Sequence, residues 1–319
     1  MKKILIFSLV AFAFVSGCSK KTVASTEMKG SVAMVLSGLK TDEAFNQYTY
    51  EGMMRATKER GIKTAYREEV SQDEQIEIIR QFAQQGYEII IGQGGQFGEA
   101  LQQVAKEFPN TKFVFSVGTD TGGIPNLTAA TVSYSQAGYL GGIMAAHATK
   151  TNKVAMITGV FYASQSQMRD SFKKALADVN PKIEFTAIET NDWADTDTAY
   201  NATKALAAQG YDVVFPCLDA AGAGVAAAAD DTKHIAIVGS VADYAAIYNC
   251  KAVVGSIDFN WEGLGYIEAC GELVDGKVHI IGMAQDGIRA IVNNLSDSGK
   301  EAIENAKKDL AEGKIDIPD

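Results

Sequence analysis

Residues 31–56, SVAMVLSGLKTDEAFNQYTYEGMMRA, contain side chains that could bind a flat, polar ligand. Asp42 and Asn46 can hydrogen-bond a polyol or an amine, and Phe45 can stack on a ring. The alternative is that Asp42 caps a helix and Phe45 belongs to the core. The apolar run 32–36 has no polar alternation and predicts a parallel strand that is covered on both faces. A strand followed by a loop and a helix places that loop at the carboxyl edge of a sheet, where open α/β sheets bind ligands.

Further candidate ligand residues end or follow other apolar segments that predict strands, so we expect them at the same kind of edge. They are Gln93 and Gly94 in the glycine-rich turn GQGGQFG, Tyr162 after MITGV, Trp193 in the loop after residues 183–188, Asp219 after VVFPC, Asp243 in SVADY and Asp258 in VVGSIDF. The rings could stack on a ligand, and the turn could bring backbone close to it. If the chain folds into two lobes joined by a hinge, the alternative role for each aspartate is a helix cap or a salt bridge at the hinge. The alternative for each ring is packing within its own lobe.

The motifs of common catalytic and metal sites are absent from the sequence. GQGGQFG follows a strand and opens a helix, but Phe97 breaks the G-x-G-x-x-G spacing of a dinucleotide-binding turn. No P-loop or G-x-S-x-G motif occurs, and the pair Asp192 and Asp195 lies in a polar loop, where carboxylates are usually solvated. The cysteine and histidine spacings match no zinc site. We therefore expect no catalytic residue, no metal, no cofactor and no enzymatic activity.

The N-terminus has the pattern of a bacterial export signal. Lys2 and Lys3 precede an apolar segment, 4–15, that is too short to span a bilayer, and VSGC then resembles a lipobox. This pattern predicts a signal peptide over 1–17, a lipid on Cys18 and a polar tether over 18–29. The alternative is an ordinary signal peptide with a chance cysteine.

Charge and cysteine content narrow the function further. The net charge is −10 and no basic stripe occurs, so we expect no nucleic-acid partner. Cys250 and Cys270 could pair outside the cytoplasm, whereas Cys217 lies in an apolar strand.

From residue 30 the chain alternates between strand and helix patterns. Predicted strands span 32–36, 63–67, 87–91, 112–117, 126–132, 153–159, 183–188, 211–217, 235–239 and 252–256, and 274–281 is a strand or a crossover. Predicted helices span 47–60, 73–85, 99–108, 135–150, 199–209 and 296–312, a loop and helix span 162–179, and a turn and helix span 218–229. QQGYEIIIG in the first half and AQGYDVVFP in the second repeat one helix-to-strand pattern. Two lobes of similar doubly wound α/β build explain this repeat.

The first loop, DEAFNQ, resembles the D-x-S-F-N-Q signature of the basic membrane lipoprotein family, the nucleoside-type substrate-binding lipoproteins of ABC importers. The resemblance continues over nearly the whole mature chain, in IIIGQGGQFGEALQQVAKEFPNTKFVF, LTAATVSYSQAGYLGGIMAA, GYDVVFPCLDAAGAGVAAAA, IAIVGS and VVGSIDF. It implies a type I periplasmic-binding fold, with two Rossmann-like lobes that are joined by a three-stranded hinge and close on a ligand. The expected lobes are 30–134 plus 257–282 and 135–256 plus 283–319, with hinge crossings near 133–135, 256–258 and 282–284.

The resemblance also implies ligand contacts. Asp42 and Asn46 would contact a nucleoside and Phe45 would stack on its base. Several family positions differ in this chain: Val117 replaces an Asp, GSVADY lacks the first Asp of G-V-D-x-D-Q, no Lys follows Ser256, and Met168 replaces a second stacking Phe. These differences change the residues that bind ribose in the family.

The expected function is that of a lipid-anchored substrate-binding protein of an ABC importer. It would bind a nucleoside or similar flat heterocycle and deliver it to a membrane permease, from a position on the outer side of the cell membrane. Riboflavin is the alternative ligand, since Trp193 and Trp261 could hold a larger ring. A sensor that docks on a membrane signalling protein and transports nothing is the alternative function.

Overall fold

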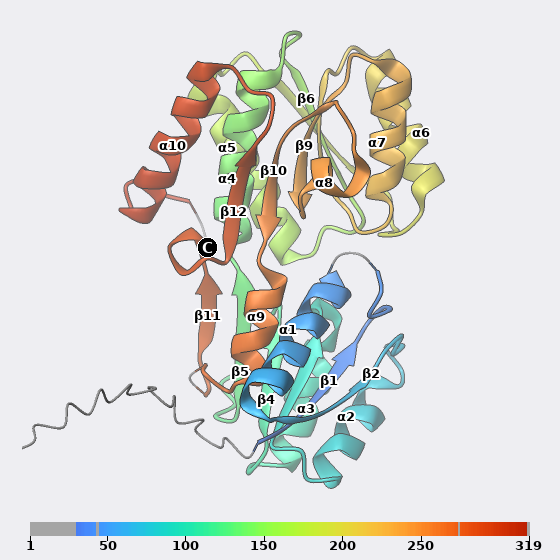
Figure 1. The fold of residues 1–319 in the computed structure, drawn as a ribbon, viewed down its shortest axis with the longest axis vertical. Coiled ribbons are helices and arrows are strands. Elements are labelled where there is room, and N and C mark those ends of the chain that lie inside the picture. The colour runs from blue at the N-terminus through green and yellow to red at the C-terminus, as the bar shows by residue number, and fades with distance from the viewer. Residues whose placement is uncertain (1–29, 43–44, 274, 318–319) are drawn as a thin grey trace, which may run out of the picture.

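Two six-stranded sheets, each covered by helices on both faces, form two lobes along the long axis of the molecule (Figure 1). The structure is a computed structural model that describes residues 30–42, 45–273 and 275–317. The predicted signal peptide, tether and lipidated Cys18 lie outside the described residues. Within the described ranges, no helix is long and apolar enough to cross a membrane.

The first lobe contains a sheet in the order β11-β5-β4-β3-β1-β2, in which all neighbours are parallel. Its strands are β1 (Ser31–Leu36), β2 (Lys63–Arg67), β3 (Ile89–Gln93), β4 (Lys112–Ser116), β5 (Leu127–Val132) and β11 (Val278–Ile281). Its helices are α1 (Phe45–Arg60), α2 (Gln75–Gln84), η1 (Gly95–Phe97), α3 (Gly98–Glu107) and α9 (Trp261–Ala269). α1 and α9 pack together on one face, and α2 and α3 cover the other.

The second lobe contains a sheet in the order β12-β10-β9-β8-β6-β7, in which only the edge pair β10–β12 is antiparallel. Its strands are β6 (Lys153–Thr158), β7 (Glu184–Glu189), β8 (Val213–Cys217), β9 (Ala236–Val241), β10 (Val253–Phe259) and β12 (Ile288–Val292). Its helices are α4 (Tyr134–Ala148), α5 (Ala163–Val179), α6 (Thr196–Ala208), α7 (Gly222–Thr232), α8 (Tyr244–Tyr248) and α10 (Asp297–Ala311), and η2 (Met283–Gln285) precedes β12. Each predicted strand overlaps an observed one, because buried apolar runs such as residues 32–36 have no amphipathic helical alternative.

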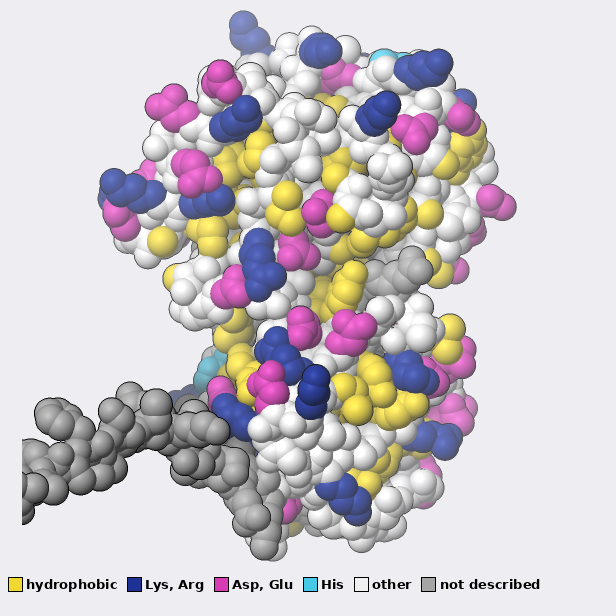
Figure 2. Space-filling model, in the orientation of Figure 1, with side chains coloured by type: hydrophobic (Ala, Val, Ile, Leu, Met, Phe, Trp, Pro, Cys, Tyr) yellow, Lys and Arg dark blue, Asp and Glu magenta, His cyan; other side chains and the backbone are white. Residues whose placement is uncertain are grey.

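The chain crosses between the lobes three times (Figure 1): at Ser133, at Asn260, and through residues 282–287. The second crossing was expected near 256–258, but Ile257 pairs with Ser240 on one side and Ala290 on the other, inside the second sheet. The lobe boundary expected at residue 257 therefore differs from the observed end of β10 at Phe259. On the face shown in Figure 2 the molecule narrows between the lobes, and acidic and basic side chains are interspersed over both.

Two α-helices and one strand were not predicted: α8, α9 and β12. In α9, WEGLGYIEA carries two glycines that weaken the helix pattern. Packing against α1 explains Gly265, because a Cβ there would lie 2.3 Å from the Thr49 carbonyl oxygen; in α1, a Cβ on Gly52 would lie 2.1 Å from the Glu262 carbonyl oxygen. The backbones of α1 and α9 thus approach more closely than side chains allow, and tertiary contact overrides local propensity.

The cysteines of the described chain are free. Cys250 packs in a core of the second lobe and Cys270 in a core of the first. The pairing considered from the sequence is therefore absent from this structure.

Candidate functional site

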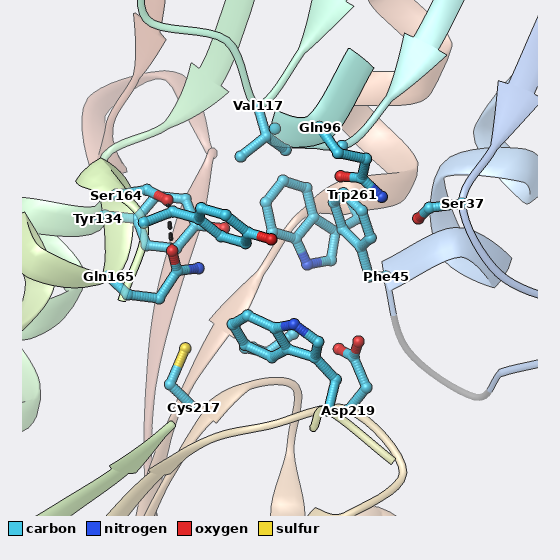
Figure 3. Close-up of a pocket in the computed structure, with 15 residues that line it drawn as sticks. Ser37, Phe45, Gln96, Val117, Tyr134, Ser164, Gln165, Cys217, Asp219 and Trp261 are labelled. Carbon is cyan, nitrogen blue, oxygen red and sulfur yellow. Dashed lines mark hydrogen bonds between the residues drawn. The ribbon is translucent and has the colours of Figure 1, made fainter. Parts of the chain in front are cut away.

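A cavity of about 690 Å³, partly open to solvent, lies between the lobes (Figure 3). The first lobe and the crossings contribute Ser37, Phe45, Gly94, Gly95, Gln96, Val117, Tyr134 and Trp261, and the second lobe contributes Tyr162, Ser164, Gln165, Trp193, Cys217, Asp219 and Val241. Since both lobes line the cavity, a ligand there would contact both.

Aromatic rings form two pairs around this cavity. Phe45 and Trp261 meet edge to face in the first lobe, with ring centroids 5.0 Å apart and an interplanar angle of 82°. Tyr162 and Trp193 lie nearly parallel in the second lobe, with centroids 6.4 Å apart and an angle of 12°. Tyr162 is 48% exposed, so its ring is accessible to a ligand. Rings of this kind offer flat, apolar surfaces for stacking.

The loop that carries Trp193 is held at several points. Asp192 accepts hydrogen bonds from the backbone of Ala194 and Asp195, and Asp195 caps α6 through the Thr198 backbone. The two carboxylates therefore order the loop. A Cβ on Gly159 would lie 2.4 Å from the indole of Trp193, so only glycine lets the indole lie against β6.

The indole nitrogen of Trp261 is a buried donor without a partner in the described structure. Trp261 is 1% exposed, and in Figure 3 its nitrogen faces the space between the lobes. A buried donor that is left unsatisfied costs about 1–3 kcal/mol. An acceptor on a ligand would remove that cost.

Asp219 joins this cavity to a neighbouring one of about 760 Å³, which is lined by Asp42, Ser240, Tyr244 and Tyr248 among others and shares Asp219 and Val241 with the first. Removal from solvent and, to a smaller extent, the nearby Asp42 carboxylate raise the pKa of Asp219 to about 7. Burial likewise raises the pKa of the Cys217 thiol to about 12. The thiol is therefore neutral and lacks the reactivity of a thiolate.

Two valines at the cavity wall have strained backbones. Val117 has φ 65° and Val241 has φ 73°, a left-handed conformation that β-branched residues rarely adopt. Each follows or ends a strand, β4 in the first lobe and β9 in the second. Strain of this kind clusters at ligand sites, and here it occurs on both sides of the cavity.

The structure brings six of the ten predicted ligand residues to the two cavities: Asp42, Phe45, Gly94, Tyr162, Trp193 and Asp219. Asp42 also has the alternative role considered for it, since it accepts hydrogen bonds from the backbone of Asn46 and Gln47 and so caps α1. For these six residues, contact with a ligand stays a prediction.

The other four, Asn46, Gln93, Asp243 and Asp258, line neither cavity, because each is committed elsewhere. The Asn46 amide donates to Asp42 at 2.8 Å, and Gln93 donates to Thr49 at 2.6 Å within the first lobe. Asp243 caps α8, and Asp258 lies 3.8 Å from Arg289 at the hinge. For both aspartates the structure shows the alternative, a helix cap and a hinge salt bridge.

Several cavity residues were not among the predicted set: Ser37, Gly95, Gln96, Val117, Tyr134, Ser164, Gln165, Cys217, Val241 and Trp261. Ser37, Val117, Cys217 and Val241 end or follow strands, so the rule that selected the aspartates could have found them. Trp261 was named from the sequence only for the riboflavin alternative, because of its large ring. It opens a helix that the sequence pattern did not predict, so no positional signal placed it at the site.

Comparison with known proteins identifies the family. The model of the family described as "Bmp: ABC transporter substrate-binding protein PnrA-like" matches residues 29–319. The chain belongs to this family. The resemblance seen in the sequence is confirmed, and the protein is a substrate-binding protein of the ABC-transporter type.

The chain is also similar to individual known proteins, and solved structures share its fold. The ABC transporter nucleoside-binding protein BmpA of Lactococcus lactis is 26% identical, with 99% of each chain covered. A purine-binding protein of Brucella abortus is 26% identical over 80% of this chain and 72% of its own. A solute-binding protein of an ABC transporter system from Aeropyrum pernix superposes with a TM-score of 0.81 at 16% identity, covering 91% of this chain and 94% of that one. The predicted type I periplasmic-binding fold is confirmed.

Proposed function

We propose that this chain is a lipid-anchored receptor that binds a nucleoside or a similar flat heterocycle between its lobes and delivers it to an ABC permease. The observation that carries the proposal is the cavity with an aromatic pair on each lobe, Phe45 with Trp261 and Tyr162 with Trp193. The names of the similar Lactococcus and Brucella proteins, which refer to nucleoside and purine binding, support the same ligand class.

The mechanism follows from the two-lobed build. A ring that stacks on both aromatic pairs gains contacts only when the lobes are close, so ligand shifts the population towards the closed form. The three crossings allow that motion, because each is a short segment between two rigid sheets. The permease would recognise the closed form, and a lipid on Cys18 would hold the receptor at the membrane.

Thermal unfolding of the full chain, purified in detergent, tests the ligand class. Adenosine, guanosine, uridine and riboflavin are titrated separately, and a bound ligand stabilises the protein by about 2.7 kcal/mol at a hundred times its Kd. Stabilisation by nucleosides supports the proposal, and stabilisation by riboflavin alone replaces the nucleoside with the alternative ligand. If none of the four stabilises the protein, the proposed ligand class is wrong.

The lipid anchor has its own test. The wild-type chain should partition into the membrane fraction and incorporate radiolabelled fatty acid, whereas Cys18→Ala should do neither. Incorporation of label into Cys18→Ala would exclude Cys18 as the lipidated residue.

A further inference from the structure

We propose that the ligand carries a positively charged arm, which lies in the second cavity between Asp42 of the first lobe and Asp219 of the second while the ring of the ligand occupies the aromatic cavity. This inference rests on the proposed ligand site and specifies the chemistry of what binds there.

The first argument is the charge of the two cavities. Their described walls contain two carboxylates, Asp42 and Asp219, and no lysine, arginine or histidine. No hydrogen bond or basic group of the described chain lowers the pKa of Asp219. A phosphate or carboxylate on the ligand would therefore meet only negative charge, which disfavours nucleotides and acids. A cation would meet opposite charge from both lobes.

The second argument is a buried polar group without a partner. The hydroxyl of Tyr244 belongs to a residue that is 2% exposed, forms no hydrogen bond in the described structure, and lies on a side chain that lines the second cavity. A phenol oxygen can accept a hydrogen bond from an ammonium group. Tyr244 thus offers an uncommitted acceptor on a side chain that lines the same cavity as the two carboxylates.

The third argument is continuity between the cavities. Asp219 and Val241 line both, so one molecule can extend from the aromatic cavity into the acidic one. The donor that faces the aromatic cavity, the Trp261 indole N–H, requires an acceptor, which the nitrogens and carbonyls of heterocycles provide. The aromatic faces nearby also attract a cation at the junction. The ligand that satisfies these groups has a ring with acceptors and a cationic arm.

Closure gives the charge a function. When the lobes approach, the two carboxylates come together in a region with little water, where like charges repel strongly. A neutral arm leaves that repulsion in place, whereas a cationic arm neutralises it. The acidic pair therefore opposes closure around neutral ligands and favours closure around cationic ones.

Matched probes test the proposal. Adenosine, 5′-amino-5′-deoxyadenosine and adenosine 5′-monophosphate share one ring and differ in the charge of the arm. We expect the full chain in detergent, measured calorimetrically at pH 7, to bind the amino analogue about tenfold or more tightly than adenosine, since charged hydrogen bonds are the stronger ones. The monophosphate should bind more weakly than either.

Two variants test whether Asp219 is responsible for tighter binding of the amino analogue. Asp219→Asn should remove the advantage of the amino analogue, so that the ratio of its affinity to that of adenosine falls to about one, whatever the variant does to adenosine binding itself. Asp170→Asn is the matched control, because it removes the same charge from an exposed position of the second lobe and should preserve the advantage. Equal affinity of adenosine and its amino analogue would overturn the cationic arm while leaving the proposed function intact. Binding of none of the three probes would overturn both.

Discussion

The ring of Phe45 meets the indole of Trp261 nearly at right angles, with the two centroids 5.0 Å apart. Phe45 begins α1 and Trp261 begins α9, the helix that packs on α1 immediately after the second crossing. This aromatic wall is therefore complete within the first lobe before any ligand binds. Tyr162 and Trp193 form the wall of the second lobe. Under the proposed function, a flat ligand would be bound by two preformed halves, and closure would need only to bring them together.

Truncation of a second-lobe ring should separate binding from folding. Trp193→Ala is expected to weaken nucleoside binding by about 1–3 kcal/mol, the usual contribution of stacking on an aromatic residue. The melting temperature of the empty protein should change little, because Trp193 is only partly buried. Titration calorimetry with the best nucleoside measures the first effect. Tyr50→Ala is the control, since that ring pairs with Tyr66 and lines neither cavity.

One added methyl group should move the same ring. In Gly159→Ala the new Cβ would overlap the Trp193 indole, so the indole must leave its position and nucleoside affinity should fall. The shift is visible in a Trp261→Phe background, where Trp193 is the only remaining tryptophan and reports its own fluorescence. Gly30→Ala, whose Cβ would approach other atoms no closer than 4.0 Å, is the control. An unchanged emission maximum in Gly159→Ala would show that the contact is not tight.

Glu268 should make stability fall as pH rises. The residue is fully buried on α9, neither of its carboxylate oxygens has a partner in the described structure, and burial raises its pKa to about 8. The folded state therefore holds a proton that the unfolded state releases above the ordinary value of 4.5. Stability is then greatest below that value and declines between about pH 5 and 8, by a contribution on the order of 3 kcal/mol.

Denaturant unfolding across that pH range measures the effect. Glu268→Gln should flatten the decline, because the amide is neutral throughout, while the exposed Glu301→Gln should leave it unchanged. A decline of equal size in Glu268→Gln and in wild type would show that Glu268 is not the group responsible.

Asp219→Asn should stabilise the empty protein at alkaline pH. The pKa of Asp219 is raised to about 7, so the wild type loses stability as pH rises from about 4 to 7 and this carboxylate ionises opposite Asp42. Because Asp219 is partly exposed, the expected gain from the neutral amide is only about 1 kcal/mol at pH 8. Thermal unfolding at pH 5 and pH 8 measures it. A gain of equal size at both pH values would point to packing rather than charge.

Sequence pattern predicted the centres of the sheets because strands such as β1, β5 and β8 are buried on both faces. Runs such as residues 32–36 therefore have one stable arrangement. Every predicted strand overlaps an observed one, including the more exposed edge strands β2 and β7. α9 was not predicted, because its glycine-containing pattern is weak and its stability depends on close backbone contact with α1. That contact occurs at Gly52 and Gly265, which are distant in sequence.

The site was harder to predict, because position along a strand does not fix where a side chain points. Asp219 and Gln93 both lie at the carboxyl ends of strands, yet Asp219 reaches the cavities whereas Gln93 turns to Thr49 inside the first lobe. Asp258 lies inside β10 rather than beyond it, and its cross-strand neighbour is Arg289. Register and pairing decide these outcomes, and both depend on partners that local sequence does not reveal.

The order in which the chain is made does not match the order in which the lobes can be completed. The first sheet begins at Ser31 but gains its edge strand only at Val278–Ile281, and the face beside α1 is covered only by α9. On the ribosome, the N-terminal lobe must therefore wait until most of the protein has been synthesised. The finished fold buries apolar residues of α1 such as Met53 and Ala56 completely. Until α9 has been synthesised, these residues lack one of the surfaces that will cover them. We expect the two lobes to fold almost together at the end of synthesis, and the nascent chain to depend on being kept unfolded until that point.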